Sequence, residues 1–195
     1  IPNCAATRHA HFVLDGSGPA VLEPPSLDQW PKVTWTAGGS SKRVNLDTLT
    51  RAEVASWKPG ETLLLNGKML TGRDAAHKRI ADLFASGQGL PPGVDFANRA
   101  IYYVGPVDPV RDEVVGPAGP TTATRMDKFT DMMLEKTGLI VMIGKSERGP
   151  VAIESIRKHQ AAYLMAVGGA AYLVSKAIRA ARVVAFEELG MEAIY

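Results

Sequence analysis

Residues 139–145 read LIVMIGK, a run of five apolar residues followed by a glycine and a lysine. Such a run is typical of a buried strand, and the lysine then stands where the strand ends. Residues 66–79 read NGKMLTGRDAAHKR and repeat the pattern, with Arg73 after the glycine. In open α/β sheets such strand ends gather at one rim, where ligands bind. We therefore expect Arg73 and Lys145 to share a rim.

A third stretch, GPTTATRMD at residues 119–127, places two hydroxyls and an arginine on the first turn of a predicted helix. Apolar residues at helical spacing predict that this helix runs from Thr122 to Lys136. Thr121 and Arg125 are four residues apart and lie on the same side of the turn if Thr121 is close to helical. Unpaired N–H groups and the helix dipole favour a carboxylate or phosphate there. The alternative is a threonine N-cap followed by a solvated arginine.

Three strand ends thus present a set of polar side chains to one rim: Arg73, Thr121 with Arg125, and Lys145. Two arginines and a lysine suit a small dianion, because a guanidinium group pairs with a carboxylate through two parallel hydrogen bonds. A plainer interpretation stays open, in which Arg73 is a surface residue and Lys145 a solvated strand end.

Three neighbouring polar residues are predicted to have structural roles. Asp74 is expected to be the N-cap of a helix over residues 75–85, because aspartate is a favoured capping residue. Asp127 is expected to orient Arg125 or another basic group. His77 is expected to orient a neighbour or to pack against the sheet.

The pattern of strands and helices changes along the chain. Turn residues predict an early hairpin of residues 11–15 and 20–23. Further strands are expected at residues 33–36, 43–46, 61–71 (kinked at Asn66-Gly67), 100–104, 139–143, 162–167, 183–186 and 190–195. Further helices are expected at residues 51–57, 151–160 and 170–179. The pattern predicts an α/β fold, a β/β/α layered domain with a mixed, partly parallel sheet.

Composition narrows the function classes. The chain has 195 residues, of which 46% are hydrophobic and 22% charged, as in ordinary globular proteins. Its net charge of +2 argues against nucleic-acid binding, and no apolar run approaches the roughly 20 residues that span a bilayer. A single cysteine excludes an intrachain disulfide and suits a reducing cytoplasm.

Five segments in order carry a family resemblance: GRDAAHKR, GPTTATRMD, an apolar strand followed by Gly-Lys, VGGAAYLVSKAI and ELGMEAI. Together they resemble the C-terminal (β-type) region of the iron–sulfur class I fumarases, which the two-subunit tartrate dehydratases share. The resemblance runs from about Cys4 to Tyr195. It implies a swivelling β/β/α domain, similar to the mobile domain of aconitase, and the residue pattern agrees with this.

The resemblance also implies roles for the residues at the rim. Arg73, Arg125 and Lys145 would hold the two carboxylates of malate or fumarate. Thr121 would be the base that takes the proton beside a carboxylate, and Thr122 would be a plain N-cap, although spacing does not order the two threonines. Because an alcohol is a weak acid, this chemistry needs a dry pocket with cations around the hydroxyl.

Cys4 is the one cysteine of the chain, and a lone cysteine is usually a small buried apolar residue. The resembling fumarases use a C-x-A-x-R segment for one of three cysteines that hold a [4Fe–4S] cluster, and residues 4–8, CAATR, match it. The resemblance therefore implies that Cys4 is one metal ligand, with the other two on an N-terminal domain. The open iron would act as a Lewis acid on a substrate hydroxyl. No cluster is expected on this chain alone.

These features predict the C-terminal domain of a longer hydro-lyase that reversibly hydrates fumarate to malate. Residues 1–10 are expected to be an interdomain connector and residues 11–195 a single domain. The alternatives are the β subunit of tartrate dehydratase or another C4-dicarboxylate hydro-lyase, or, for the isolated chain, a non-catalytic subunit-interaction module. The isolated chain is expected to be inactive. The whole enzyme is expected to be a cytoplasmic homodimer whose N-terminal domain binds the cluster, with no nucleic-acid or membrane partner.

Overall fold

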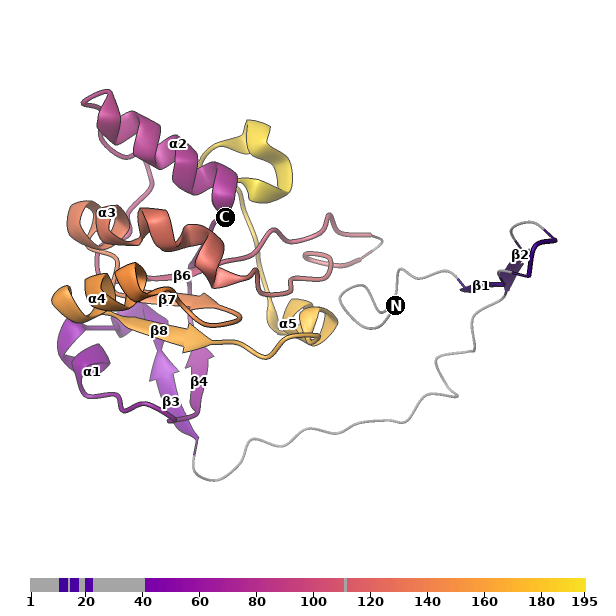
Figure 1. The fold of residues 1–195 in the computed structure, drawn as a ribbon, viewed down its shortest axis with the longest axis horizontal. Coiled ribbons are helices and arrows are strands. Elements are labelled where there is room, and N and C mark those ends of the chain that lie inside the picture. The colour runs from indigo at the N-terminus through magenta and orange to yellow at the C-terminus, as the bar shows by residue number, and fades with distance from the viewer. Residues whose placement is uncertain (1–10, 14, 18–19, 23–40, 111) are drawn as a thin grey trace.

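A parallel sheet of four strands forms the centre of the computed structural model, which describes residues 11–13, 15–17, 20–22, 41–110 and 112–195 (Figure 1). Its strands, in spatial order, are β5 (Leu70–Thr71), β6 (Ala100–Tyr102), β7 (Val141–Gly144) and β8 (Ala162–Met165). Every residue of β6 and β7 is buried, since these strands are covered on both faces. The apolar runs of the sequence therefore form the interior of the sheet.

Helices cover one face of this sheet (Figure 1). They are α2 (Asp74–Ala85), α3 (Asp127–Thr137) and α4 (Pro150–Lys158). Met126, Met133 and Met142 lie in the core between helices and sheet, together with Phe96 and Ile101. The helix predicted from Thr122 begins as a 3₁₀ turn, η3 (Ala123–Met126), and continues as α3 until Gly138, whose φ of 73° ends it.

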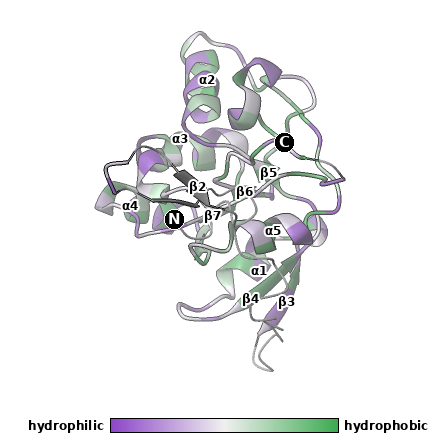
Figure 2. Cartoon of the chain, turned by 90° about the vertical axis from the view of Figure 1, so that its right-hand side faces the viewer, coloured by the Kyte–Doolittle hydropathy of each residue, from purple (hydrophilic) through white to green (hydrophobic). Residues whose placement is uncertain are grey.

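A smaller layer packs on the opposite face (Figure 2). It comprises two parallel strands, β3 (Lys42–Asn45) and β4 (Leu63–Asn66). Three short helices complete it: η2 (Leu46–Thr48), α1 (Arg51–Ala55) and α5 (Ala171–Ala177). Its apolar side chains join those of the sheet in a second cluster that includes Val44, Val54 and Ile140. The resulting three layers confirm the prediction of an α/β layered domain.

Several predicted elements of the first half are confirmed. The hairpin is β1 (His11–Val13) with β2 (Ala20–Leu22), paired antiparallel. Thr50 caps α1, because its side chain accepts a hydrogen bond from the Glu53 amide. The strand predicted over residues 61–71 divides at its kink, and its halves join two different sheets as β4 and β5. Residues 33–36, predicted as a strand, lie outside the described residues.

The prediction of a strand at residues 190–195 is wrong. Residues Glu187–Glu192 form the 3₁₀ helix η4, interrupted by Gly190 at φ 58°. The strand predicted over residues 183–186 is reduced to one bridge between Ala185 and Ile194. Tertiary contacts decide this local structure, since the Glu192 carboxylate accepts a hydrogen bond from the Ala75 amide at the start of α2.

Candidate dicarboxylate site

The carboxyl ends of β5, β6 and β7 lie next to one another because the three strands are parallel neighbours. The hydrogen bonds of the sheet extend past the strands: the Gly72 amide donates to the Tyr102 carbonyl, and the Tyr103 amide donates to the Ile143 carbonyl. Arg73 follows β5 and Lys145 follows β7. The expected rim of strand ends therefore exists in the structure.

Thr121 enters this rim from the segment before η3. Its amide donates to the Tyr103 carbonyl at 2.7 Å, and its carbonyl accepts from the Lys145 amide at 3.1 Å. The next residue, Thr122, forms a parallel bridge with Lys145. Gly144 permits this approach, since a Cβ there would lie 3.2 Å from the Thr121 carbonyl oxygen and 3.0 Å from Tyr103 Cδ2. Thr121 and Lys145 are thus neighbours across two hydrogen-bonded backbones.

The polar tips of these neighbours have no protein partner among the described residues. Within residues 41–110 and 112–195, the Thr121 hydroxyl has no hydrogen-bond partner and the Lys145 ammonium group has no ion-pair partner. Both side chains are half-buried. Thr122 is the N-cap residue of η3, as predicted, although its hydroxyl makes no capping hydrogen bond. A cation and two hydroxyl groups that lack partners in the described part of the chain could donate hydrogen bonds to an anionic ligand.

Arg73 occupies the turn between β5 and α2. Its side chain is 21% exposed, and its Nη2 lies 3.2 Å from Oε1 of Glu192. Arg73 itself is the N-cap residue of α2, and Asp74 is the first helical residue, so the prediction that Asp74 caps this helix is wrong.

The Asp74 carboxylate instead pairs with Arg125. Arg125 Nε donates to Asp74 Oδ1 at 3.0 Å, and Arg125 Nη2 lies 2.8 Å from Asp74 Oδ2. The same carboxylate lies 3.8 Å from Arg73 Nε, so it joins two arginines that are 52 positions apart in the chain. Half of the Arg125 side chain is exposed. The structure therefore brings Arg73 and Arg125 together around one acidic residue.

His77 holds the backbone of its neighbour Arg73, in agreement with the prediction that it orients a neighbouring residue. Its Nδ1 lies 2.7 Å from the Arg73 carbonyl, and its ring packs edge-on against Tyr103 at 5.4 Å between centroids. Burial lowers the pKa of His77 to about 4, so the ring is neutral at pH 7 and its Nδ1–H donates to the carbonyl. Its role is to hold the backbone that carries Arg73.

Comparison with known proteins shows which family this chain belongs to. The family model for the fumarase C-terminus matches residues 16–195. This chain belongs to the fumarase C-terminal family. It is 34% identical over 200 residues to the aerobic class I fumarate hydratase of Escherichia coli (strain K12), which covers 99% of this chain and 36% of that protein. It is 33% identical over 151 residues to the putative L(+)-tartrate dehydratase subunit beta of Methanocaldococcus jannaschii, covering 75% of this chain and 76% of that subunit.

The fumarase C-terminal domain spans only part of several of these relatives. Fumarate hydratase 2 of Leishmania major is 33% identical over 146 residues, which are 74% of this chain and 25% of that protein. The chain therefore corresponds to about a third or less of these fumarate hydratases.

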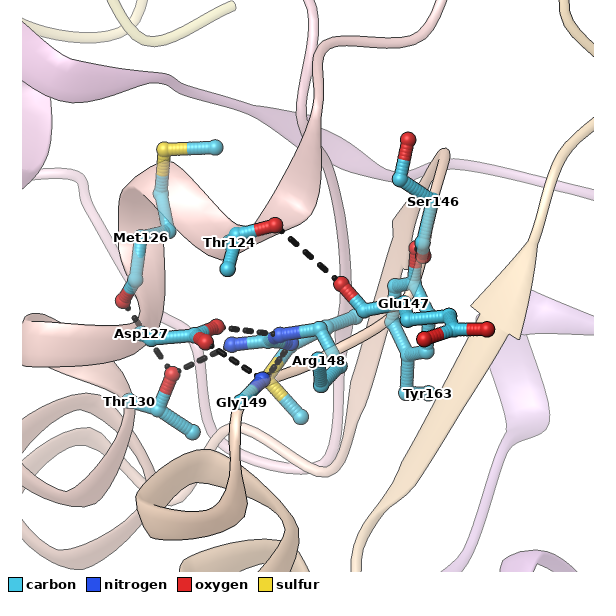
Figure 3. Close-up of polar contacts among 10 residues, drawn as sticks. Thr124, Met126, Asp127, Thr130, Ser146, Glu147, Arg148, Gly149 and Tyr163 are labelled. Atoms are coloured by element: carbon cyan, nitrogen blue, oxygen red, sulfur yellow. Dashed lines mark hydrogen bonds and ion pairs between the residues drawn. The ribbon is translucent and has the colours of Figure 1, made fainter.

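A buried arginine after Lys145 is a structural feature of this fumarase C-terminal domain that the sequence pattern does not predict (Figure 3). Arg148 is 2% exposed, and its Nε lies 2.6 Å from Oδ1 of Asp127. The other Asp127 oxygen accepts from the Gly149 amide at 2.7 Å. Asp127 therefore orients a basic group as predicted, and that group is Arg148 and not Arg125.

Aromatic rings enclose the Arg148 guanidinium group. It lies 5.7 Å from the Tyr103 ring centroid and 5.1 Å from that of Tyr163, and one of its amino groups donates to the Thr130 hydroxyl. Burial raises the pKa of Tyr103 to about 12. These contacts fix the loop that follows Lys145. The surrounding sequence, SERGP, reads as a solvated turn, and only the tertiary structure shows that the arginine is buried.

The described part of this fumarase C-terminal domain does not fit a metal cluster by itself. Within residues 41–110 and 112–195 and the short N-terminal segments, no group of three or more His, Cys, Asp or Glu side chains could hold a metal ion. Cys4, the predicted cluster ligand, lies outside the described residues. Across the same residues, no helix combines the length and the apolar character needed to cross a lipid bilayer.

Proposed function

We propose that this domain forms the dicarboxylate-binding wall of a hydro-lyase that interconverts fumarate and malate. The observation that supports the proposal is the backbone arrangement: Arg73 and Lys145 follow parallel strands of one sheet, and the Thr121 backbone is hydrogen-bonded to Tyr103 and Lys145 between them. Arg125 reaches the same cluster through its ion pair with Asp74. Two carboxylates of one substrate supply the negative charge that these cations match.

The binding step follows from the groups without protein partners. The Lys145 ammonium group would hold one carboxylate, since no described acidic side chain pairs with it. Arg73 would hold the other through donors that Glu192 leaves unused, because a guanidinium group has five N–H donors and Glu192 contacts one amino group. Arg125 would exchange part of its contact with Asp74 for the substrate.

Thr121 is our candidate for the base. In the direction from malate, its oxygen would take the proton from the carbon beside a carboxylate, while the hydroxyl on the neighbouring carbon would accept a proton from an acid group outside this domain and leave as water. The Thr121 oxygen must be deprotonated beforehand, and its backbone neighbour Lys145 is a cation that would stabilise the alkoxide. Because Thr121 is half-buried, less water surrounds its oxygen, and the charge of Lys145 would be screened less.

We further propose that Cys4 is one ligand of a [4Fe–4S] cluster, whose other ligands come from outside the described residues. When bound, that cluster would supply a Lewis acid. The cytoplasmic location, the homodimer and the N-terminal partner domain remain proposals that follow from the fumarase relationship.

A second candidate is the β subunit of a tartrate dehydratase. It is supported by one observation: this chain is 33% identical over 151 residues to the putative L(+)-tartrate dehydratase subunit beta of M. jannaschii. Measuring turnover of fumarate, malate and tartrate by the whole protein distinguishes the two candidate functions, because a tartrate dehydratase should prefer tartrate.

The test of the proposed base uses three single variants of the whole protein. Thr121→Ala should lower kcat for fumarate hydration by about 100-fold or more, as expected for loss of a general base, with KM changed only a few-fold. Thr124→Ala is the matched control, because Thr124 is exposed and its hydroxyl donates to the Glu147 carbonyl. Thr122→Ala should retain most activity. Loss of turnover in Thr122→Ala with normal turnover in Thr121→Ala would reassign the base.

A further inference from the structure

The C-terminal segment of the chain packs against the start of α2, beside the candidate site (Figure 1). The Thr71 amide donates to the Tyr195 carbonyl, and the Tyr195 amide donates to the Thr71 hydroxyl, both at 3.1 Å. Ile194 is fully buried and bridges to Ala185. These contacts fix the backbone of residues 193–195 at the end of β5, directly before Arg73.

Glu192 reaches from this segment to two groups at once. Its Oε2 accepts a hydrogen bond from the Ala75 amide at 2.8 Å, and its Oε1 lies 3.2 Å from Arg73 Nη2. Ala75 is in the first turn of α2, where amides have no partner within the helix. The side chain of Glu192 is 23% exposed, so the contact is shielded from much of the solvent.

The Arg73 side chain lies in a narrow slot. A Cβ placed on Gly105 would lie 3.0 Å from Arg73 Cδ and 3.0 Å from its Nη1, and 3.1 Å from the Met191 carbonyl oxygen. The Gly105 backbone therefore lies against both the Arg73 side chain and the Met191 carbonyl, and the next residue, Glu192, contacts the Arg73 guanidinium group. Within the described residues, the buried Nε of Arg73 has no hydrogen-bond partner. Arg73 thus contacts Glu192 through one amino group and lies 3.8 Å from the Asp74 carboxylate through Nε, and its remaining N–H donors are available to a ligand.

We propose that Glu192 is a positioning residue that holds the Arg73 guanidinium group in the orientation needed for a substrate carboxylate. The proposal rests on the proposed function, in which Arg73 binds that carboxylate. A long arginine side chain loses much conformational freedom when it binds, and a contact that orders it beforehand raises affinity for the ligand. Glu192 restricts the Arg73 side chain in this way, and its own backbone is held by the contacts of residues 193–195.

Glutamine at position 192 cannot reproduce both contacts. The carboxylate accepts from Ala75 with one oxygen and contacts Arg73 with the other. A neutral amide has a single acceptor oxygen, and its NH₂ group would face one of the two donors. Glu192→Gln therefore breaks one contact while it keeps the size of the side chain.

The experiment compares Glu192→Gln with Glu188→Gln in the whole protein. Glu188 is the matched control, because it also joins η4 to α2, through an exposed ion pair of 3.1 Å with Arg79. Glu192→Gln should raise KM for fumarate by about 10-fold and leave kcat within about 3-fold, since a displaced guanidinium group weakens binding. Glu188→Gln should match the wild type in both constants. Equal KM values for the two variants would overturn the proposal.

Arg73→Ala and the double variant Arg73→Ala/Glu192→Gln test whether Glu192 acts through Arg73. The double variant should have the same kcat/KM as Arg73→Ala, because Glu192 has nothing left to position. A further loss in the double variant would overturn the positioning role. A normal KM in Arg73→Ala would overturn the proposed function as well, whereas an impaired Arg73→Ala beside a normal Glu192→Gln would overturn this inference alone.

Gly105→Ala provides an independent probe if Glu192→Gln fails to fold. The added methyl group must displace the Arg73 side chain, and KM should rise as in Glu192→Gln. A folded Gly105→Ala variant with an unchanged KM would contradict the slot that we describe.

Discussion

Replacing Arg148 by methionine removes a guanidinium group that is 2% exposed and leaves the Asp127 carboxylate with the Gly149 amide as its remaining described partner. Breaking a buried ion pair by removing one partner typically costs about 3–5 kcal/mol. Asp127 is 16% exposed and gains some hydration, so the lower part of that range applies. Loss of the contacts with the rings of Tyr103 and Tyr163 adds about 0.5–1 kcal/mol. We expect Arg148→Met to lower the free energy of unfolding by about 3–4 kcal/mol.

Urea unfolding of the 195-residue chain, followed by far-ultraviolet circular dichroism, measures this loss. The midpoint should fall by about 1–2 M urea at an unchanged slope. The double variant Asp127→Asn/Arg148→Met should be more stable than Arg148→Met, because no unpaired carboxylate remains. Arg157→Met is the control, since its ion pair with Glu154 joins side chains that are 77% and 65% exposed, and its midpoint should not move measurably. An Arg148→Met midpoint equal to that of the control would show that the buried ion pair with Asp127 does not stabilise the fold.

Three further predictions concern the site. In the whole protein, Arg125→Ala should lower kcat/KM for fumarate by about 100-fold or more, because it removes a cation and leaves the Asp74 carboxylate to repel the substrate; a value near that of Arg157→Ala would remove Arg125 from the site. His77 has a pKa of about 4 in the folded chain and 6.5 in the unfolded chain. Its contribution to the free energy of unfolding is therefore fully present above pH 6.5 and is lost as the pH falls toward 4. Wild type should therefore lose about 3 kcal/mol more than His77→Gln between pH 7 and pH 4 in urea unfolding, and identical pH profiles would show that His77 is not buried neutral. The purified 195-residue chain should have no measurable hydratase activity, and turnover of fumarate by that chain would refute the need for a second cluster-binding part.

The sequence predicts the rim of the site because local patterns determine it. Each apolar run with its following glycine and cation specifies a strand end, and parallel neighbours place those ends together. Three short stretches therefore predict Arg73, Thr121 and Lys145 as the candidates for this rim. Their backbone proximity is confirmed, and their roles toward a substrate remain predictions.

The ion pairs around the rim are not predictable in the same way. Asp74 is read as a helix cap because aspartate commonly caps helices, but its carboxylate binds Arg125, 51 residues away. Glu192 lies 117 residues from the Ala75 amide that it binds, within a stretch that resembles a strand. Such partners depend on how the layers pack, and a local pattern carries no information about them.

The most direct test of the account is the structure of the whole protein with malate bound. We expect the malate carboxylates within hydrogen-bonding distance of the side chains of Arg73, Arg125 and Lys145, and the carbon that loses its proton facing the Thr121 hydroxyl. Malate bound away from the carboxyl ends of β5, β6 and β7, with no contact to these side chains, would show that the rim is not the substrate site.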